Sequence, residues 1–292
     1  MKMLILGLVA SAALTAAVAG FSPPRSTAAS PAPVAALVAA PPRVTFTPPL
    51  APAVPIAKIA PEAPKGEELP AFPMTNPKNK QVPLTPDKKT IIAEVSGEGD
   101  AKKVVRVGIA CEVCLREGPL EQFLCKKGTK EHEAIVRVDL DAELVHLAII
   151  AAGGKPGTPT GFVDPKTEQA KHTPATGSKV NVSVHYKKDG KLFLHPAQEW
   201  IWDIKKKQPI EHTWVFAGSQ FIKDPDNPQA KPYYGANSGD IFSISNFPYS
   251  TLEFPVPISK DDAQLNFEAK TDKIPPLTSK VWILIEVPAE KK

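Results

Sequence analysis

The sequence lacks the short motifs by which many enzymes are identified. It contains no G-x-S-x-G nucleophile turn, Walker phosphate loop, dinucleotide fingerprint or H-E-x-x-H metal motif. It also lacks the C-x-x-C-H sequence that binds haem covalently. The sequence therefore does not indicate any of the enzyme classes that these motifs define. Whether the protein is another kind of enzyme stays open.

The chain also has little net charge and few long apolar runs. The net charge is +4, and the lysines are spread through turns, so no nucleic-acid partner is predicted. The apolar run Leu4–Ala19 has 16 residues, fewer than the roughly 20 that span a bilayer. Lys2 precedes this run and the small-x-small sequence Ala17-Val18-Ala19 ends it, which is typical of a secretory signal peptide. Retention of the run as an uncleaved anchor is the alternative.

We therefore expect residues 1–19 to be a signal peptide and the protein to be exported to the periplasm or the extracellular space. No second long apolar run follows, so no stable membrane span is expected after cleavage. The partner is then an unknown ligand or protein of the cell envelope.

Proline is concentrated in one biased segment. Of the 33 prolines, 17 lie between Ser22 and Pro86, together with abundant alanine and few aromatics. Proline donates no backbone hydrogen bond, and such a composition buries too little apolar surface to offset the entropy of ordering. We predict a disordered Pro/Ala-rich linker over residues 20–87 and one folded domain over residues 88–292.

Alternation of apolar and polar residues dominates the folded part and predicts strands. Asp189-Gly190 predicts a hairpin turn, because both residue types tolerate positive φ. The predicted strands are Val105–Leu115, His132–Leu140, Ser178–Tyr186, Lys191–His195, Trp214–Phe221, Asp240–Ser245, Thr251–Phe254 and Val281–Val287.

One helix is predicted between these strands. Asp139 or Asp141 is suited to cap it, and Gly153-Gly154 ends it. A shorter helix is predicted after Pro196. Together the pattern predicts an α+β, β-rich fold with mainly antiparallel sheets and one or two packed helices. The predicted apolar face of the main helix consists of Leu144, Leu147, Ala148, Ile150 and Ala151.

The three cysteines allow several hypotheses about their chemical role. Cys111 and Cys114 form a C-x-x-C pair, but residues three apart in a strand point to opposite faces, so we expect Cys111 inside and Cys114 outside. With Cys125 and His132 they make a C-x2-C-x10-C-x6-H series, whose residue types suit zinc. The other hypotheses are a redox pair, a disulfide of Cys125 with Cys111 or Cys114, and separate free thiols.

His132 is predicted to lie on the same strand face as Val136 and Val138, with His146 of the helix as a partner. A histidine on an apolar face usually makes structural hydrogen bonds. The alternative is that Cys125, His132 and His146 converge as a metal or acid–base group.

Several sequence blocks resemble the YdjY-like domain family of bacteria. They are Gly118-Pro119-Leu120-Glu121, Lys130-Glu131-His132-Glu133, the helix from His146 to Gly154-Lys155-Pro156-Gly157, Trp214–Ser219 and Tyr234–Asp240, within a similarity from about Val104 to Val287. The resemblance implies an exported or envelope-associated domain of uncharacterised function. Its motif positions point to Glu121, Cys125, His132, Glu133 and His146 as site candidates. Some members are labelled iron–sulfur proteins, but three cysteines are fewer than the four thiolates of an ordinary cluster.

The leading hypothesis is an exported binding or interaction module on a proline-rich stalk, with no cofactor. The alternative is an envelope enzyme, metal-dependent or redox, that uses zinc or another transition metal. It would use Cys125, His132 and His146 as ligands and Glu121 or Glu133 as general base.

Overall fold

The computed structural model describes residues 65–163, 169–258 and 266–289. The predicted signal peptide and most of the predicted linker lie outside the described residues. Eleven strands form the largest sheet: β1 (Lys80–Pro83), β2 (Ile91–Ser96), β3 (Lys103–Val113), β4 (Gln122–Lys126), β5 (Ala134–Val138), β8 (Lys179–Lys188), β9 (Lys191–Pro196), β12 (Trp214–Phe216), β15 (Phe242–Ser243), β16 (Leu252–Glu253) and β18 (Lys280–Glu286).

The remaining described elements are short and peripheral to that sheet. They are the strands β6 (Gly161–Val163), β7 (Ala170–Thr173), β10 (Ile201–Asp203), β11 (Gln208–Pro209), β13 (Phe221–Ile222), β14 (Tyr233–Tyr234) and β17 (Phe267–Ala269), the helix α1 (Ala142–Ala151), and the 3₁₀ turns η1 (Gly99–Ala101), η2 (Ala197–Trp200) and η3 (Gly235–Ser238). Strands far outnumber helices, as the sequence predicts, and η2 is the predicted short helix after Pro196.

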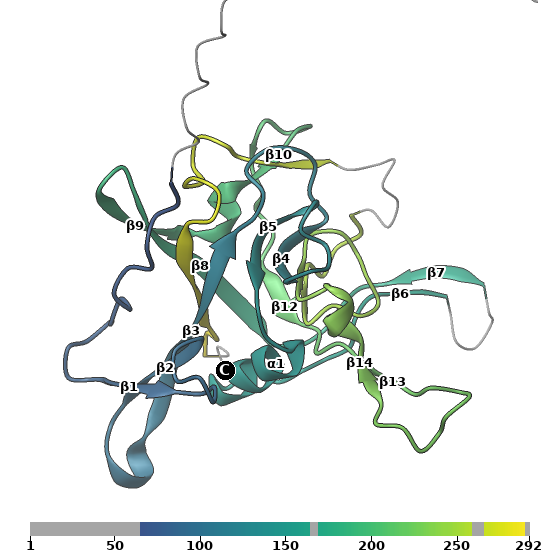
Figure 1. The fold of residues 1–292 in the computed structure, drawn as a ribbon. Helices are drawn as coiled ribbons and strands as arrows, with labels where there is room; N and C mark the ends of the chain where they lie inside the picture. The colour runs from purple at the N-terminus through teal and green to yellow at the C-terminus, as the bar shows by residue number, and fades with distance from the viewer. Residues whose placement is uncertain (1–64, 164–168, 259–265, 290–292) are drawn as a thin grey trace, which may run out of the picture. The chain divides into compact units, whose positions relative to one another are not determined.

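Eight strands of the large sheet close into a ring, which we call the barrel. The pairings run from β3 through β18, β8, β12, β16, β15, β4 and β5, and β5 pairs again with β3. Two of these pairings, β4 with β5 and β15 with β16, are parallel, and the others are antiparallel. Closure removes the exposed edges of these strands, and β1, β2 and β9 attach outside the ring. Figure 1 labels the barrel strands β3, β4, β5, β8 and β12, together with α1.

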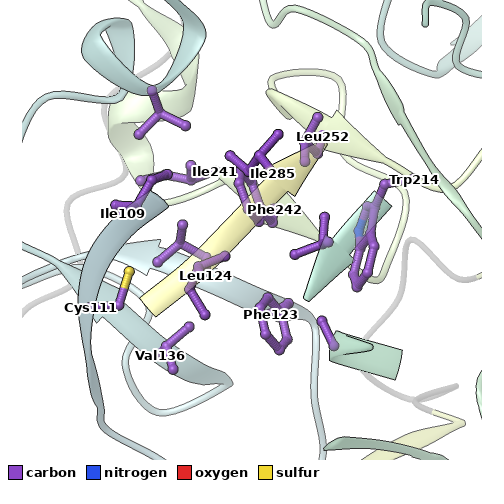
Figure 2. Close-up of a cluster of buried hydrophobic side chains, with 14 of the residues drawn as sticks. Ile109, Cys111, Phe123, Leu124, Val136, Trp214, Ile241, Phe242, Leu252 and Ile285 are labelled. Atoms are coloured by element: carbon purple, nitrogen blue, oxygen red, sulfur yellow. The ribbon is translucent and has the colours of Figure 1, made fainter. Parts of the chain in front are cut away.

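The sequence of β18 is apolar at nearly every position because both faces of the strand are buried. Val281, Ile283 and Ile285 belong to the main core, with which Ile109 and Leu124 also pack (Figure 2). The alternate residues Trp282 and Leu284 belong to a second apolar cluster. A strand buried on both faces reads as a continuous apolar run rather than an alternating one.

The second cluster is completed by the segment before β1. Phe72 packs edge-on against Trp282 with ring centroids 5.2 Å apart, and the Trp282 indole N–H donates to the carbonyl of Pro70 at 2.9 Å. Gly108 permits this approach, since a Cβ there would lie 2.4 Å from the Phe72 ring. The prediction that the linker continues to residue 87 is therefore wrong: the described residues from 65 onward belong to the folded part, because Phe72 supplies apolar cover for β18.

The predicted helix is confirmed, but its predicted apolar face is only partly buried, through Ala148 and Leu144, and its predicted side-chain cap is wrong. Val145 and Ile149 are buried with Ala142 and Ala148, whereas Leu147 and Ile150 are 58% and 43% exposed. Asp141 occupies the N-cap position without a side-chain hydrogen bond. The amide of Ala142 instead donates to Oδ1 of Asn237 at 2.8 Å, so a residue 95 positions away caps the helix.

Most strand predictions are confirmed in place but not in length. The hairpin of β8 and β9 turns at Asp189 and Gly190, with φ of 50° and 76° as predicted. The prediction Trp214–Phe221 is too long, because the ladder of β12 ends at Phe216. Positive φ at Gly218 and Ser219 then turns the chain. Within the described residues, no helix is long and apolar enough to cross a membrane.

Candidate functional site

The three cysteines are free thiols in different surroundings. Cys111 lies in β3 and Cys125 in β4, and both are buried, whereas Cys114 follows the end of β3 and is half-buried. Figure 2 shows Cys111 among core side chains. The Cys114 thiol donates to the carbonyl of Ala134 at 3.1 Å and makes a side-chain hydrogen bond with Cys125. The fold thus brings Cys114 and Cys125 together, while a disulfide of Cys125 with either partner stays a prediction.

The surroundings of the buried thiols favour their protonated forms. Burial raises the pKa of the Cys111 thiol well above its usual value. The hydrogen bond with Cys114, followed by burial, raises the pKa of the Cys125 thiol. Because the thiolate is the nucleophile and the metal ligand, these surroundings weaken both functions at Cys111 and Cys125.

We expect the three thiols to react with iodoacetamide in a fixed order. In the native protein at pH 8, Cys114 should be alkylated at least about tenfold faster than Cys111 and Cys125, because only Cys114 is partly accessible. Mass spectrometry of the digested protein measures each rate, and unfolding in denaturant should equalise them. A Cys114 that reacts only after reduction would instead show that it is paired in a disulfide.

His132 lies outside the strand in which the sequence places it. β5 begins at Ala134, and the His132 side chain is 78% exposed in the turn before it. Its Nε2 lies 3.7 Å from Oε2 of Glu133. The prediction that His132 faces the core with Val136 is wrong, because the chain turns here before it enters the strand.

His146 is held by aromatic residues rather than by His132. Its Nδ1 lies 2.9 Å from the Tyr234 hydroxyl, and its ring meets Phe216 edge-on at 4.8 Å. Burial lowers the pKa of His146, so the neutral imidazole is favoured. Burial also raises the pKa of Tyr234 to about 12, and its hydroxyl donates to the carbonyl of Gly218 at 3.1 Å. His146 therefore joins α1 to the chain around β12 and β14.

Cys125, His132 and His146 thus contact three different sets of partners. Across the described residues, no three His, Cys, Asp or Glu side chains are arranged to hold a metal ion. The metal and acid–base hypothesis for these residues stays a prediction without support from their contacts.

Four charged residues do meet, and we call them the Lys130 cluster: Glu121, Lys130, Glu133 and Asp240. The Lys130 Nζ lies 3.7 Å from Oε2 of Glu121, 3.3 Å from Oε1 of Glu133 and 3.2 Å from Oδ1 of Asp240. It also lies 4.2 Å from the centroid of the Phe247 ring, within cation–π distance. Glu121 precedes β4, Lys130 and Glu133 lie between β4 and β5, and Asp240 precedes β15. Residues far apart in the chain therefore converge on one ammonium group.

A buried hydrogen-bond chain fixes Asp240 in the Lys130 cluster. Its Oδ1 accepts from Nε2 of Gln122 at 2.9 Å, and its Oδ2 accepts from Ser238 at 2.9 Å. The Oε1 of Gln122 in turn accepts from Ser243 at 2.9 Å, and Ser243 accepts from Ser250 at 2.7 Å. Because both oxygens of Asp240 are held, the carboxylate is oriented toward Lys130 before any ligand arrives.

The electrostatics of the Lys130 cluster leave an excess of negative charge. Burial alone would lower the pKa of Lys130, but the carboxylates of Asp240, Glu133 and Glu121 raise it overall, so the ammonium is retained. Three carboxylates face this one ammonium, and the side chains of Lys130 and Glu133 are 25% and 17% exposed. The Lys130 cluster therefore reaches solvent through Lys130 and Glu133, whereas Glu121 and Asp240 are buried, and its excess of negative charge suits a positively charged group.

Sequence reasoning named Glu121 and Glu133 but missed Lys130 and Asp240. Both missed residues stand inside sequence blocks that carry the family resemblance, at the start of Lys130–Glu133 and the end of Tyr234–Asp240. Charged residues at the ends of such blocks were the available signal. Their contact depends on the pairing of β15 with β4, which no local pattern reveals.

A further carboxyl group, Glu253, lies buried in β16. Burial raises its pKa to about 7, although hydrogen bonds from the amide of Thr160 and the side chain of Asn246 act in the opposite direction. The negative charge of Asp240 also contributes to the increase. Glu253 is fully buried, and Asp240 of the Lys130 cluster is near enough to affect its pKa.

Comparison with known proteins identifies one relationship. A family model of the YdjY domain matches residues 95–286. No curated protein and no solved structure matches the chain. The match contains every residue of the Lys130 cluster and agrees with the similarity seen from about Val104 to Val287.

Proposed function

The chain belongs to the YdjY domain family, and from this premise we propose that it is an exported binding or interaction module, carried on a proline-rich stalk, whose binding site is the Lys130 cluster. The signal-peptide pattern over residues 1–19 and the proline content of residues 20–64 support export and tethering. The binding partner carries a positively charged group, such as a lysine or arginine side chain.

The convergence of Glu121, Lys130, Glu133 and Asp240 at one partly exposed place carries this proposal. A purely structural ion pair needs one carboxylate for one ammonium, whereas this site has three. The excess negative charge makes the site complementary to a cation, and complementary charge favours rapid and selective association. Phe247 provides an apolar wall beside it.

Site-specific crosslinking in the native envelope tests the proposal. We expect His132→p-benzoylphenylalanine, at the rim beside Glu133, to form a discrete covalent adduct upon irradiation. The same substitution at Leu192, which is 63% exposed on β9, serves as the control and should form none. The adduct at position 132 should decrease at least about fivefold when Glu133→Gln is added, since one carboxylate is removed.

Three outcomes would contradict the proposal. Equal adducts from positions 132 and 192, or an adduct that is insensitive to Glu133→Gln, would show that the cluster is not the binding site. Elemental analysis of protein purified without chelator provides the second check. A stoichiometric metal that is lost in His132→Ala would favour a metal-dependent enzyme instead.

A further inference from the structure

A surface cavity of about 340 Å³ lies where β3 adjoins β5, apart from the Lys130 cluster. Four cationic side chains line it: Lys89, Lys127, Arg137 and Lys280. Its volume is at the lower end of the range of small-molecule sites, about 300–1,000 Å³. We propose that this cavity binds a small dianion of the dicarboxylate or phosphate class.

The charge of the lining is the first argument. Glu112 and Asp139 are the acidic residues of the lining, so four positive charges face two negative ones and leave a net charge of +2. A concave site with an excess of one sign of charge attracts ions of the opposite sign.

The cations of this cavity outnumber the carboxylates that pair with them. Glu112 is shared by two cations: Arg137 donates to its Oε1 from Nε at 3.1 Å, and Lys280 contacts its Oε2. Burial alone would raise the pKa of Glu112, but the hydrogen bonds from Lys280 and Arg137 lower it overall, so the carboxylate is charged. One carboxylate thus serves two cations, and even with Glu131, which binds Arg137 at 2.6 Å, a positive excess remains.

Lys89 is the clearest unused cation. It is exposed in the turn before β2, and no acidic side chain of the described chain lies within ion-pair distance of its ammonium group. Lys127, in contrast, pairs with Asp139 at 2.8 Å. An incoming anion therefore gains a new partner at Lys89 without displacing an existing ion pair.

Part of the cavity lining is apolar. Leu69, Ala110 and Val138 contribute to the cavity. Such walls lower the local dielectric and strengthen charge pairing compared with open water. A dianion with a short carbon skeleton, or a phosphate group, matches both the excess of positive charge in the lining and the volume.

Isothermal titration calorimetry on the purified full chain at low salt tests the proposal. The probes are inorganic phosphate and succinate, with acetate and uncharged succinamide as controls. We expect at least one dianion to bind with a Kd below about 1 mM, and acetate and succinamide to bind at least about tenfold more weakly. Binding of phosphate alone identifies the phosphate class, and binding of succinate alone identifies the dicarboxylate class.

Two charge-reversal variants form the matched pair for locating the site. Lys89→Glu should weaken dianion binding about tenfold or more, whereas Lys191→Glu, at an exposed lysine of the β8–β9 hairpin, should change it less than about twofold. Both variants change the net charge equally, so a general electrostatic effect would appear in both. Equal losses in both variants, no binding of either dianion up to about 10 mM, or equally tight binding of acetate would overturn the proposal.

Discussion

Replacement of Lys130 with methionine is expected to lower the free energy of unfolding by about 3 kcal/mol at pH 7. Methionine keeps the apolar stem beside Phe247 but removes the ammonium that lies within 4 Å of three carboxylates. Loss of one partner from a buried charge group typically costs about 3–5 kcal/mol, and the 25% exposure of the Lys130 side chain places the cost at the lower end. Chemical denaturation monitored by tryptophan fluorescence measures this change.

Two further measurements separate charge repulsion from lost packing. In Lys130→Met, the second substitution Glu133→Gln should recover part of the lost stability, because it removes one of the three carboxylates that repel one another once the ammonium is gone. The deficit should also shrink below about pH 4, where carboxylates become protonated. Lys127→Met is the control: its pair with Asp139 is solvent-exposed, so a change below about 1 kcal/mol is expected. A deficit in Lys130→Met that is independent of pH would contradict the electrostatic explanation.

Local patterns predict the central strands of this fold well. The alternation in β3 and β8 and the continuous apolar run of β18 each reflect the faces that these strands bury. The turn at Asp189-Gly190 depends only on two residues that tolerate positive φ. Short strands such as β15 and β16 have two residues each, too few for a period to be recognised.

What the sequence could not supply is the set of contacts between distant segments. α1 has apolar residues around most of its circumference, so the periodicity alone did not show that Val145 and Ile149 face inward. Asn237, which caps α1, lies 95 positions from Ala142 in the sequence. Phe72, which covers β18, lies more than 200 positions from Trp282. Closure of the barrel through β5 and β3 likewise depends on tertiary packing, which overrides local preference.

In the candidate site, too, residue types could be predicted from the sequence but contacts between distant segments could not. Glu121 and Glu133 could be named because carboxylates in a motif are visible in a sequence. The choice of His132 and Cys125 relied on residue type alone. The structure places one histidine in solvent and the cysteine in a closed core, and it assembles the site around Lys130 and Asp240 instead. Strand pairing decides which motif residues meet.

The second large effect concerns Glu253 and the pH dependence of stability. Its pKa is about 7 in the folded protein and 4.5 in its ordinary state, so the folded protein holds a proton that the unfolded chain releases. The contribution of Glu253 is therefore fully present below about pH 4.5 and is lost as the pH rises toward 7. The total loss corresponds to about 3 kcal/mol in the free energy of unfolding between pH 4 and pH 8.

Glu253→Gln isolates this effect, because glutamine is uncharged at every pH. We expect the stability of the natural protein relative to Glu253→Gln to fall by about 3 kcal/mol between pH 4.5 and pH 8, as measured by urea denaturation at several pH values. The comparison removes the opposite pH dependence of Glu94 and Glu112, whose pKa values are lowered in the fold, since both proteins contain these residues. Glu268→Gln, at an exposed position of β17, should change stability by less than about 0.5 kcal/mol at each pH. A constant difference between the natural protein and Glu253→Gln would mean that Glu253 is charged in the folded state, with the amide of Thr160 and the side chain of Asn246 stabilising the carboxylate fully despite its burial.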